Sequence, residues 1–154
     1  MSDHPPSPTR VRGHMEMHST VPRSRIRKEF LLSCARHAAR HLEHGFGQLT
    51  FVLVTDRKMA RLHREYSGIG GTTDVLTFDL TEKDSKGIEG DIYICLDQAR
   101  RQAADLKIPL YREVARLAVH GVLHLAGFSD KTETGRDQMR RLEDLSLAAG
   151  GRRQ

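Results

Sequence analysis

Apolar runs and alternation along the chain predict a small set of β-strands. Residues 49–55 (LTFVLVT) are almost all apolar or β-branched, which favours a strand buried on both faces. Residues 73–80 alternate between apolar and polar, and residues 91–96 (DIYICL) form another short apolar run. Both patterns are typical of strands. Residues 11–17 keep their apolar side chains on one parity, which is a weaker indication of an edge strand.

Apolar residues that recur every three or four positions predict helices in the other segments. We expect these helices over about residues 22–43, 56–66, 97–106, 109–126 and 132–148. Asp97 is placed to cap the third helix, and Pro109 to open the fourth. The fourth helix is apolar almost all round over residues 114–126 (VARLAVHGVLHLA), so it belongs in the middle of the domain.

The order of these elements predicts an α+β fold. The predicted order is a strand, a helix, a strand, a helix, two strands and three helices. This order suits a small mixed β-sheet covered by helices, with a central buried helix that carries candidate metal-binding histidines. The length of 154 residues suits one domain, which we place at residues 23–150. We expect residues 1–22 to be a flexible basic N-terminal segment. The pattern does not give the order of strands in the sheet.

The composition is that of a soluble protein. Charged residues make up 29% of the chain, and no apolar run approaches the ~18 residues that cross a bilayer. The N-terminus has no apolar segment of signal-peptide type. We therefore expect a cytoplasmic protein that has no membrane partner. Cys34 and Cys95 lie far apart, and we expect both to be free thiols in the core.

The chain is basic, and much of its charge is near the N-terminus. The formal net charge is +5, and residues 1–28 hold many more arginines and lysines than acids. A basic segment favours polyanions, of which RNA is the foremost candidate. The alternative interpretation is a solvated end that has no partner.

Histidines are frequent enough that their spacing alone identifies no metal site. The H-x-x-x-H pattern occurs at His14/His18, His37/His41 and His120/His124. The first pair is close to the N-terminus, and the second lies on an arginine-rich helix that would repel a divalent cation. Only the third pair has apolar residues around it, so it is the candidate for metal binding.

The stretch HGVLHLAGFSD, residues 120–130, has the features of a three-ligand metal site. His120 and His124 are one helical turn apart and project from the same face. Gly127 can adopt a left-handed conformation that ends the helix, and Asp130 can then return to the two imidazoles. Three protein ligands and an open position are typical of catalytic zinc. The alternative is two hydrogen-bonded core histidines followed by an aspartate in a turn.

Gly121 argues against peptide hydrolysis. Metzincin proteases share the frame H-x-x-x-H-x-x-G, but a glutamate that acts as general base follows their first histidine. Glycine takes no proton from a metal-bound water. We expect Gly121 to let another element pack close to the helix. The sequence identifies no residue as the general base.

Four motifs resemble, in order, those of the YbeY family of bacterial rRNA maturation factors. They are residues 62–78 (LHREYSGIGGTTDVLTF), 90–94 (GDIYI), 120–130 (HGVLHLAGFSD) and 139–143 (M-x-x-L-E). The resemblance covers about residues 48–150. It implies a metal-dependent, single-strand-specific endoribonuclease that matures the 3′ end of small-subunit rRNA and acts in ribosome quality control. Its implied partners are rRNA and the small ribosomal subunit.

The resemblance also implies a zinc site, with one change of ligand. Members of the family hold zinc through three histidines, and these positions fall on His120, His124 and Asp130. A carboxylate is an accepted zinc ligand, but it weakens the metal as a Lewis acid and shifts preference toward harder ions such as Mn²⁺.

A second departure concerns substrate binding. The family has an arginine after the tyrosine of its L-N-x-x-Y-R segment, where this chain has Ser67, and His63 replaces the asparagine. Arg64 is the candidate substitute for binding substrate, and an exposed helix arginine is the alternative. These departures leave a second hypothesis open, a ribosome-assembly binding factor with a structural metal and little or no cleavage activity. A metallopeptidase is the third.

Overall fold

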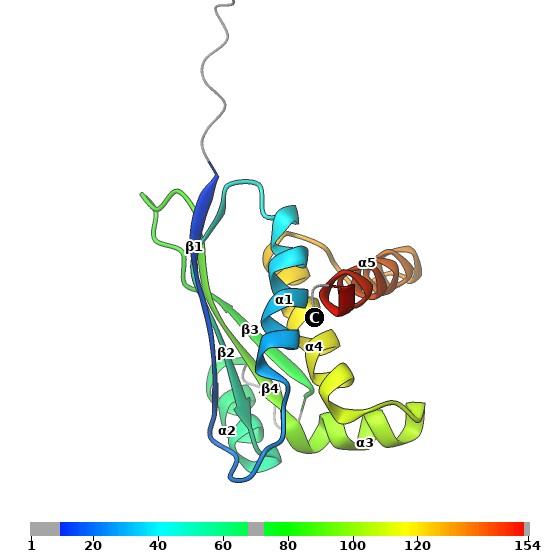
Figure 1. Cartoon of the computed structure of the whole chain (residues 1–154). Coiled ribbons are helices and arrows are strands. Elements are labelled where there is room, and N and C mark those ends of the chain that lie inside the picture. The colour runs from blue at the N-terminus through cyan, green and yellow to red at the C-terminus, as the bar shows by residue number, and fades with distance from the viewer. Residues whose placement is uncertain (1–9, 68–72, 153–154) are drawn as a thin grey trace, which may run out of the picture.

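The computed structural model describes residues 10–67 and 73–152, which form one β-sheet packed against helices (Figure 1). The strands are β1 (Val11–Ser19), β2 (Gly45–Val54), β3 (Val75–Asp79) and β4 (Ile88–Cys95). The helices are α1 (Lys28–Ala38), the short 3₁₀ helix η1 (Ala39–His41), α2 (Asp56–Ser67), α3 (Leu96–Leu106), α4 (Leu110–Leu125) and α5 (Glu133–Arg152). No helix in these ranges is both long and apolar enough to span a membrane.

The sheet is mixed, in the order β1-β2-β4-β3. β1, β2 and β4 run parallel, and β3 pairs antiparallel with β4 at one edge. Helices α1 and α4 lie against one face of the sheet, and α5 packs on both of them farther out (Figure 1). The α+β class that the order of elements predicted is therefore confirmed.

The N-terminal segment differs from the expected flexible segment at residues 1–22. Val11–Ser19 forms β1 at the edge of the sheet, as the parity of residues 11–17 indicated, and it pairs with β2 from Val11 to Ser19 while Met15 is buried in the core. Residues 1–9 lie outside the described residues. The first helix begins at Lys28 rather than near residue 22, because Arg23 adopts a positive φ of 58° in the preceding turn.

Two further sequence expectations need correction. β2 is not buried on both faces, because Leu49, Phe51 and Leu53 are fully buried whereas Thr50 and Val52 between them are only half-buried. Asp97 does not cap its own helix, since α3 already begins at Leu96. Its carboxylate instead accepts a hydrogen bond of 2.8 Å from the backbone N–H of Asp56, at the first residue of α2.

Helix α4 is the central helix of the fold, as its apolar sequence predicted. It contacts α1, α3, α5, β3 and β4, and most of its residues from Glu113 to Leu123 are buried. Gly121 allows this close packing, because a Cβ at that position would lie only 2.7 Å from Cγ2 of Ile92 on β4. The expected steric role of Gly121 is confirmed, and a glutamate does not fit there.

Both cysteines are free and buried, as the sequence predicted, and we expect them to be unreactive in the folded protein. Burial raises the pKa of Cys34 to about 11 and that of Cys95 to about 12. The thiolate is the reactive form, so raised pKa values keep both thiols protonated near pH 8. Titration with Ellman's reagent should detect no rapidly reacting thiol under native conditions and two in denaturant. A fast-reacting native thiol would contradict this assignment.

Candidate metal centre

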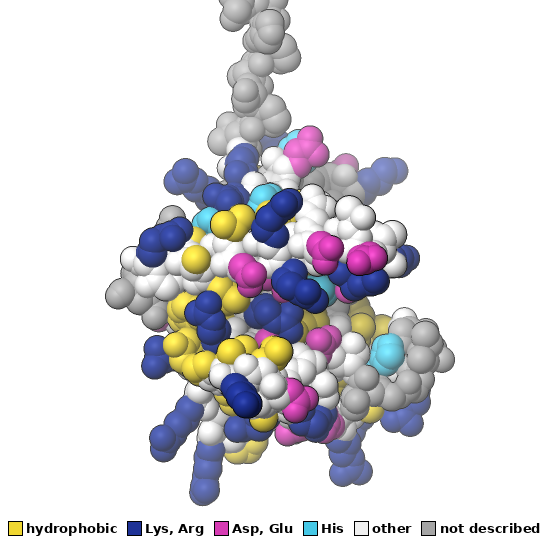
Figure 2. All heavy atoms as spheres, turned by 90° about the vertical axis from the view of Figure 1, so that its right-hand side faces the viewer, with side chains coloured by type: hydrophobic (Ala, Val, Ile, Leu, Met, Phe, Trp, Pro, Cys, Tyr) yellow, Lys and Arg dark blue, Asp and Glu magenta, His cyan; other side chains and the backbone are white. Residues whose placement is uncertain are grey.

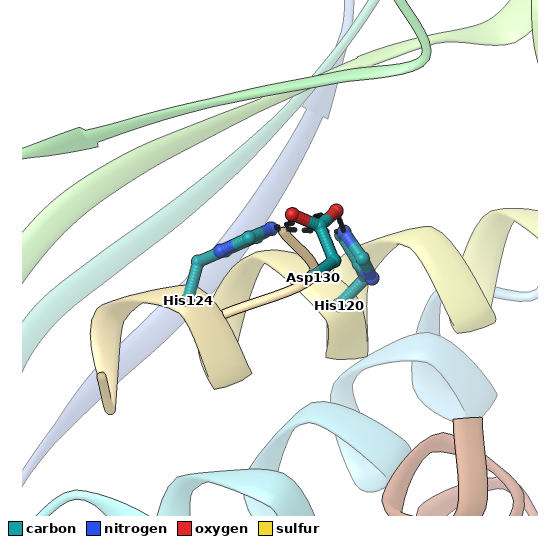
Figure 3. A group of neighbouring side chains, drawn as sticks. All are labelled: His120, His124 and Asp130. Carbon is teal, nitrogen blue, oxygen red and sulfur yellow. Dashed lines mark hydrogen bonds and ion pairs between the residues drawn. The ribbon is translucent and has the colours of Figure 1, made fainter. Parts of the chain in front are cut away.

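The two histidines of HGVLHLAGFSD project from one face of α4 toward a common point (Figure 3). Their Nε2 atoms lie 2.9 Å apart, and their rings meet nearly at right angles. The four-residue spacing on the helix produces this arrangement. Neighbouring α4 residues such as Val119, Val122 and Leu123 are fully buried, which fixes the helix that carries both rings.

Gly127 turns the chain so that Asp130 joins the histidines. Gly127 has a φ of 99°, and its N–H donates to the carbonyl of His124 at the end of α4. The chain then reverses, and Oδ2 of Asp130 lies 3.4 Å from Nε2 of His120 and 3.6 Å from Nε2 of His124. The structure therefore brings together the three side chains that the sequence singled out (Figure 3).

The donor set fits a divalent metal ion. Two ligand atoms ~2.0–2.1 Å from a tetrahedral zinc ion lie ~3.3–3.4 Å apart. The three separations of 2.9, 3.4 and 3.6 Å bracket that value. The side chains of His120, His124 and Asp130 are 19%, 33% and 44% exposed, so an ion held by them would keep a side open to solvent. Such an open side is where substrate or water enters a catalytic metal site.

A buried polar network holds His120 from behind. Its Nδ1 donates to Glu143 of α5 over 2.8 Å, which leaves Nε2 facing the other two ligands. Glu143 also accepts from Arg116, and Arg116 makes a bidentate pair with Glu113, to which Gln102 donates as well. A carboxylate behind a ligating histidine fixes both its tautomer and its orientation.

The two histidines have opposite pKa shifts. Burial lowers the pKa of His120, but the hydrogen bond and charge of Glu143, with Asp74 and Asp130, outweigh it, so the pKa is raised overall. Burial and the charge of His120 lower the pKa of His124. The lowered pKa favours the neutral, ligand-ready form of His124, whereas at His120 a proton would compete with a metal ion.

Two of the three candidate ligands, His120 and Asp130, line a cavity of about 150 Å³ together with arginines. It is lined by Arg116, His120, Asp130, Arg136, Met139, Arg140 and Glu143. Arg136 and Arg140 are exposed and one turn apart on α5, and Arg136 donates to the backbone carbonyl of Asp130 over 3.3 Å. Sequence reasoning missed this contribution of α5. The signal was present, because Arg136, Arg140 and Glu143 recur at helical spacing.

The other residues singled out from the sequence lie elsewhere. Arg64 is exposed on α2 and does not line this cavity, and the side chain of Ser67 lies outside the described residues. The pairs His14/His18 and His37/His41 belong to no group of three potential ligands in residues 10–67 and 73–152. His37 lies 2.9 Å from the hydroxyl of Ser146, and the ring of His41 packs on Phe128.

A second group of potential ligands, Asp56, Cys95 and Asp97, is already engaged within the protein. Arg101 makes a bidentate ion pair with Asp56, and the Cys95 thiol donates to the same carboxylate. Asp97 accepts from the backbone of Asp56. The group therefore joins α2 to the start of α3, and its donor atoms serve structure.

We expect Glu143→Gln to weaken metal binding by about 10- to 100-fold, because a carboxylate hydrogen-bonded to a ligating histidine contributes that much to affinity. The amide keeps the shape but removes the charge that orients His120. Competition with a fluorescent chelator measures the dissociation constants of Zn²⁺ and Mn²⁺. Asp144→Asn is the matched control, because Asp144 is the exposed neighbour on the same helix. Equal affinities of the two variants would contradict a role for Glu143 at the site.

Comparison with known proteins finds a family match over most of the chain. Residues 15–151 match the family model described as "Endoribonuclease YbeY". The Endoribonuclease YbeY of Flavobacterium psychrophilum is 35% identical over 66% of this chain and 71% of the relative, and that of Pelotomaculum thermopropionicum is 40% identical over 67% and 74%.

The fold is also similar to a solved structure, the solution structure of TM1509 from Thermotoga maritima. The two share 23% sequence identity and a TM-score of 0.62, and the match covers 89% of each chain. At this identity the likeness concerns the fold alone. The family model covers most of the sheet, α4 with its histidines, Asp130, and α5 with Glu143, and the chain therefore belongs to the Endoribonuclease YbeY family.

Proposed function

We propose that this protein is a metal-dependent endoribonuclease that cleaves single-stranded rRNA in the cytoplasm. Its substrate would be the 3′ end of small-subunit rRNA, with a role in ribosome quality control on the small subunit. The observation that carries this proposal is the convergence of His120, His124 and Asp130 on one point beside an arginine-lined cavity. Membership of an endoribonuclease family supports the reaction class.

The residues around the cavity have distinct tasks in this proposal. A bound ion would supply Lewis-acid polarisation of a phosphate oxygen or a water. Glu143 keeps Nε2 of His120 aimed at the ion's position. Arg136 and Arg140 hold the phosphodiester in the same cavity and stabilise the charge that develops at phosphorus. These two arginines supply the cation for which Arg64 was the sequence candidate.

The third ligand bears on the choice of metal. A carboxylate in place of an imidazole adds negative charge at the ion and favours harder cations. We propose Zn²⁺ as the resident ion, with Mn²⁺ as a competent substitute. Replacing Asp130 with histidine should then raise the affinity for Zn²⁺ relative to Mn²⁺.

An aromatic cluster on α2, β3 and β4 supports contacts to RNA bases. Tyr66, Phe78 and Tyr93 meet edge to face beside β3, with centroids 5.1 and 5.7 Å apart. They line a groove with Leu62, Leu80 and Asp91, and Tyr66 is 66% exposed. Exposed aromatic rings stack on bases of single strands with little sequence preference.

A ribosome-assembly binding factor with a structural metal is the second candidate. The observation that favours it is Asp130, because a carboxylate ligand makes the ion a weaker Lewis acid. The metallopeptidase is disfavoured, because Ile92 leaves no room for a glutamate at position 121.

The test is cleavage of single-stranded rRNA by the purified protein with added Zn²⁺ or Mn²⁺, beside Asp130→Ala. We expect products from the wild type that a chelator and the substitution both abolish. Binding without cleavage under every metal would favour the assembly factor. Chelator-sensitive hydrolysis of casein would instead revive the peptidase.

A further inference from the structure

Four arginines surround a second hollow on the surface, separate from the candidate metal centre. Arg10 immediately precedes β1 and Arg12 lies in it, whereas Arg36 lies in α1 and Arg40 in η1. The hollow has a volume of about 230 Å³, and Val11, Ala39, Gly45 and Phe46 complete its lining. We call this hollow, with Arg10, Arg12, Arg36 and Arg40 around it, the arginine hollow. It shares no lining residue with the cavity at His120.

No acidic residue compensates these charges within the lining. All four arginines are exposed, and none forms an ion pair with any acid in the described part of the chain. Figure 2 shows Lys and Arg side chains spread over the visible face, several of them near the end of the molecule where the described chain begins. Four guanidinium groups around one hollow repel one another, so the arrangement costs stability unless an anion is bound.

The hollow is held in place by the backbone around it. The Arg10 guanidinium donates to the carbonyls of Ala39 and Leu42 over 3.0 and 3.1 Å, which ties the start of β1 to the end of η1. Arg12 lies two residues along the same strand, and the parallel pairing of β1 with β2 fixes its position. The spacing of Arg36 and Arg40 is one helical turn. The positive charges are therefore displayed by ordered elements.

His41 follows Arg40 in η1, and its environment bears on the charge next to the hollow. Burial, and then the charge of Arg40, lower the pKa of His41. The imidazole of His41 therefore adds no charge at neutral pH, and the hollow's positive charge comes from arginine, which presents planar pairs of N–H donors. Such donors match phosphate oxygens in a bidentate way.

We propose that the arginine hollow binds backbone phosphates of single-stranded RNA at a place apart from the metal centre. This inference rests on the proposed function for its choice of RNA over other polyanions. An RNA that is cut at the metal centre and long enough to reach the hollow is held at both places. A dinucleotide bound at the metal centre does not reach the arginine hollow, so the hollow contributes to the binding of long substrates alone.

The experiment compares two double variants that remove the same charge at the same helical spacing. Arg36→Gln/Arg40→Gln removes two of the four arginines of the hollow. Arg57→Gln/Arg61→Gln removes two exposed arginines from α2. Fluorescence anisotropy with a long, cleavage-resistant phosphorothioate RNA gives the dissociation constant over a range of salt concentrations. Cleavage of a dinucleotide and chelator competition for Zn²⁺ report on the metal centre, and circular dichroism verifies folding.

We expect the variant at Arg36 and Arg40 to bind the long RNA several-fold more weakly. The slope of log K against log salt should fall by about 1.4, since each phosphate contact on a single strand contributes ~0.7. Dinucleotide cleavage and Zn²⁺ affinity should stay at wild-type values, and the α2 variant should keep the wild-type slope. An unchanged slope at Arg36 and Arg40, or equal losses in both variants, would overturn the proposal.

Two further arms separate this proposal from its alternatives. If Arg36→Gln/Arg40→Gln lost binding to phosphatidylserine vesicles while its RNA slope stayed that of the wild type, the hollow would be a lipid-binding surface and the proposal would be wrong. If the wild type cleaved no RNA but the variant still lost two phosphate contacts, the hollow would stand as an RNA site and only the proposed nuclease function would fail.

Discussion

Replacing Arg116 with methionine should lower the free energy of unfolding by about 3–5 kcal/mol, the cost of removing one partner from a buried charge network. The Glu113 and Glu143 side chains are only 0% and 4% exposed, and Arg116 bonds to both at 2.6 and 3.0 Å. Its hydrogen bonds to Glu113 raise the pKa of Arg116, so the guanidinium stays charged under all ordinary conditions. Without it, two buried carboxylates keep only Gln102 and His120 as donors.

Urea unfolding followed by circular dichroism measures the loss. Arg112→Met is the matched control, because Arg112 is exposed one turn earlier on the same helix and its replacement should change stability by no more than about 0.5 kcal/mol. Equal free energies of unfolding for the two variants would show that the network contributes nothing measurable to stability. Metal affinity of the Arg116 variant should fall as well, because Glu143 then loses the contact that anchors it behind His120.

The elements of the fold were predictable wherever their pattern is local. Alternation over residues 73–80 and the apolar run at 91–96 correspond to β3 and β4, and the apolar helix around His120 is the centre of the fold. The strand order was not predictable, because it depends on which distant strands pair. For β1, the pattern of residues 11–17 indicated a strand at the edge of the sheet, but it did not show that β2 would be its partner.

In the candidate site, too, the residues close together in sequence were predictable and those brought together by packing were not. His120, His124 and Asp130 lie within one stretch of the sequence, so helical spacing and the glycine turn were enough to bring them together. The network behind them was missed, because Glu143 and Arg116 come from different helices and meet only when α5 packs on α4. Charged residues on an otherwise apolar helix were the available signal, since a buried charge requires a partner.

Loss of a metal ligand should have the largest effect on activity. We expect His124→Ala to bind no stoichiometric metal and to cleave single-stranded RNA at least about 10²- to 10³-fold more slowly, since a Lewis-acid ion contributes several kcal/mol to the transition state. His124 and His120 face each other at 2.9 Å, and Asp130 completes the set from the far side of the glycine turn. Removing one imidazole leaves two ligands, too few for a stable site.

His14→Ala is the control for this prediction, because His14 belongs to another H-x-x-x-H pair and is exposed on β1. Elemental analysis of the purified proteins and initial rates on single-stranded rRNA give the two readouts.

Asp130→His should behave oppositely to His124→Ala, since it keeps three ligands and still permits cleavage. A His124→Ala protein that retained both metal and wild-type rates would show that catalysis does not depend on this site. Metal loss with intact RNA binding, and no cleavage by any form of the protein, would instead identify an assembly factor, because the ion would then serve structure alone.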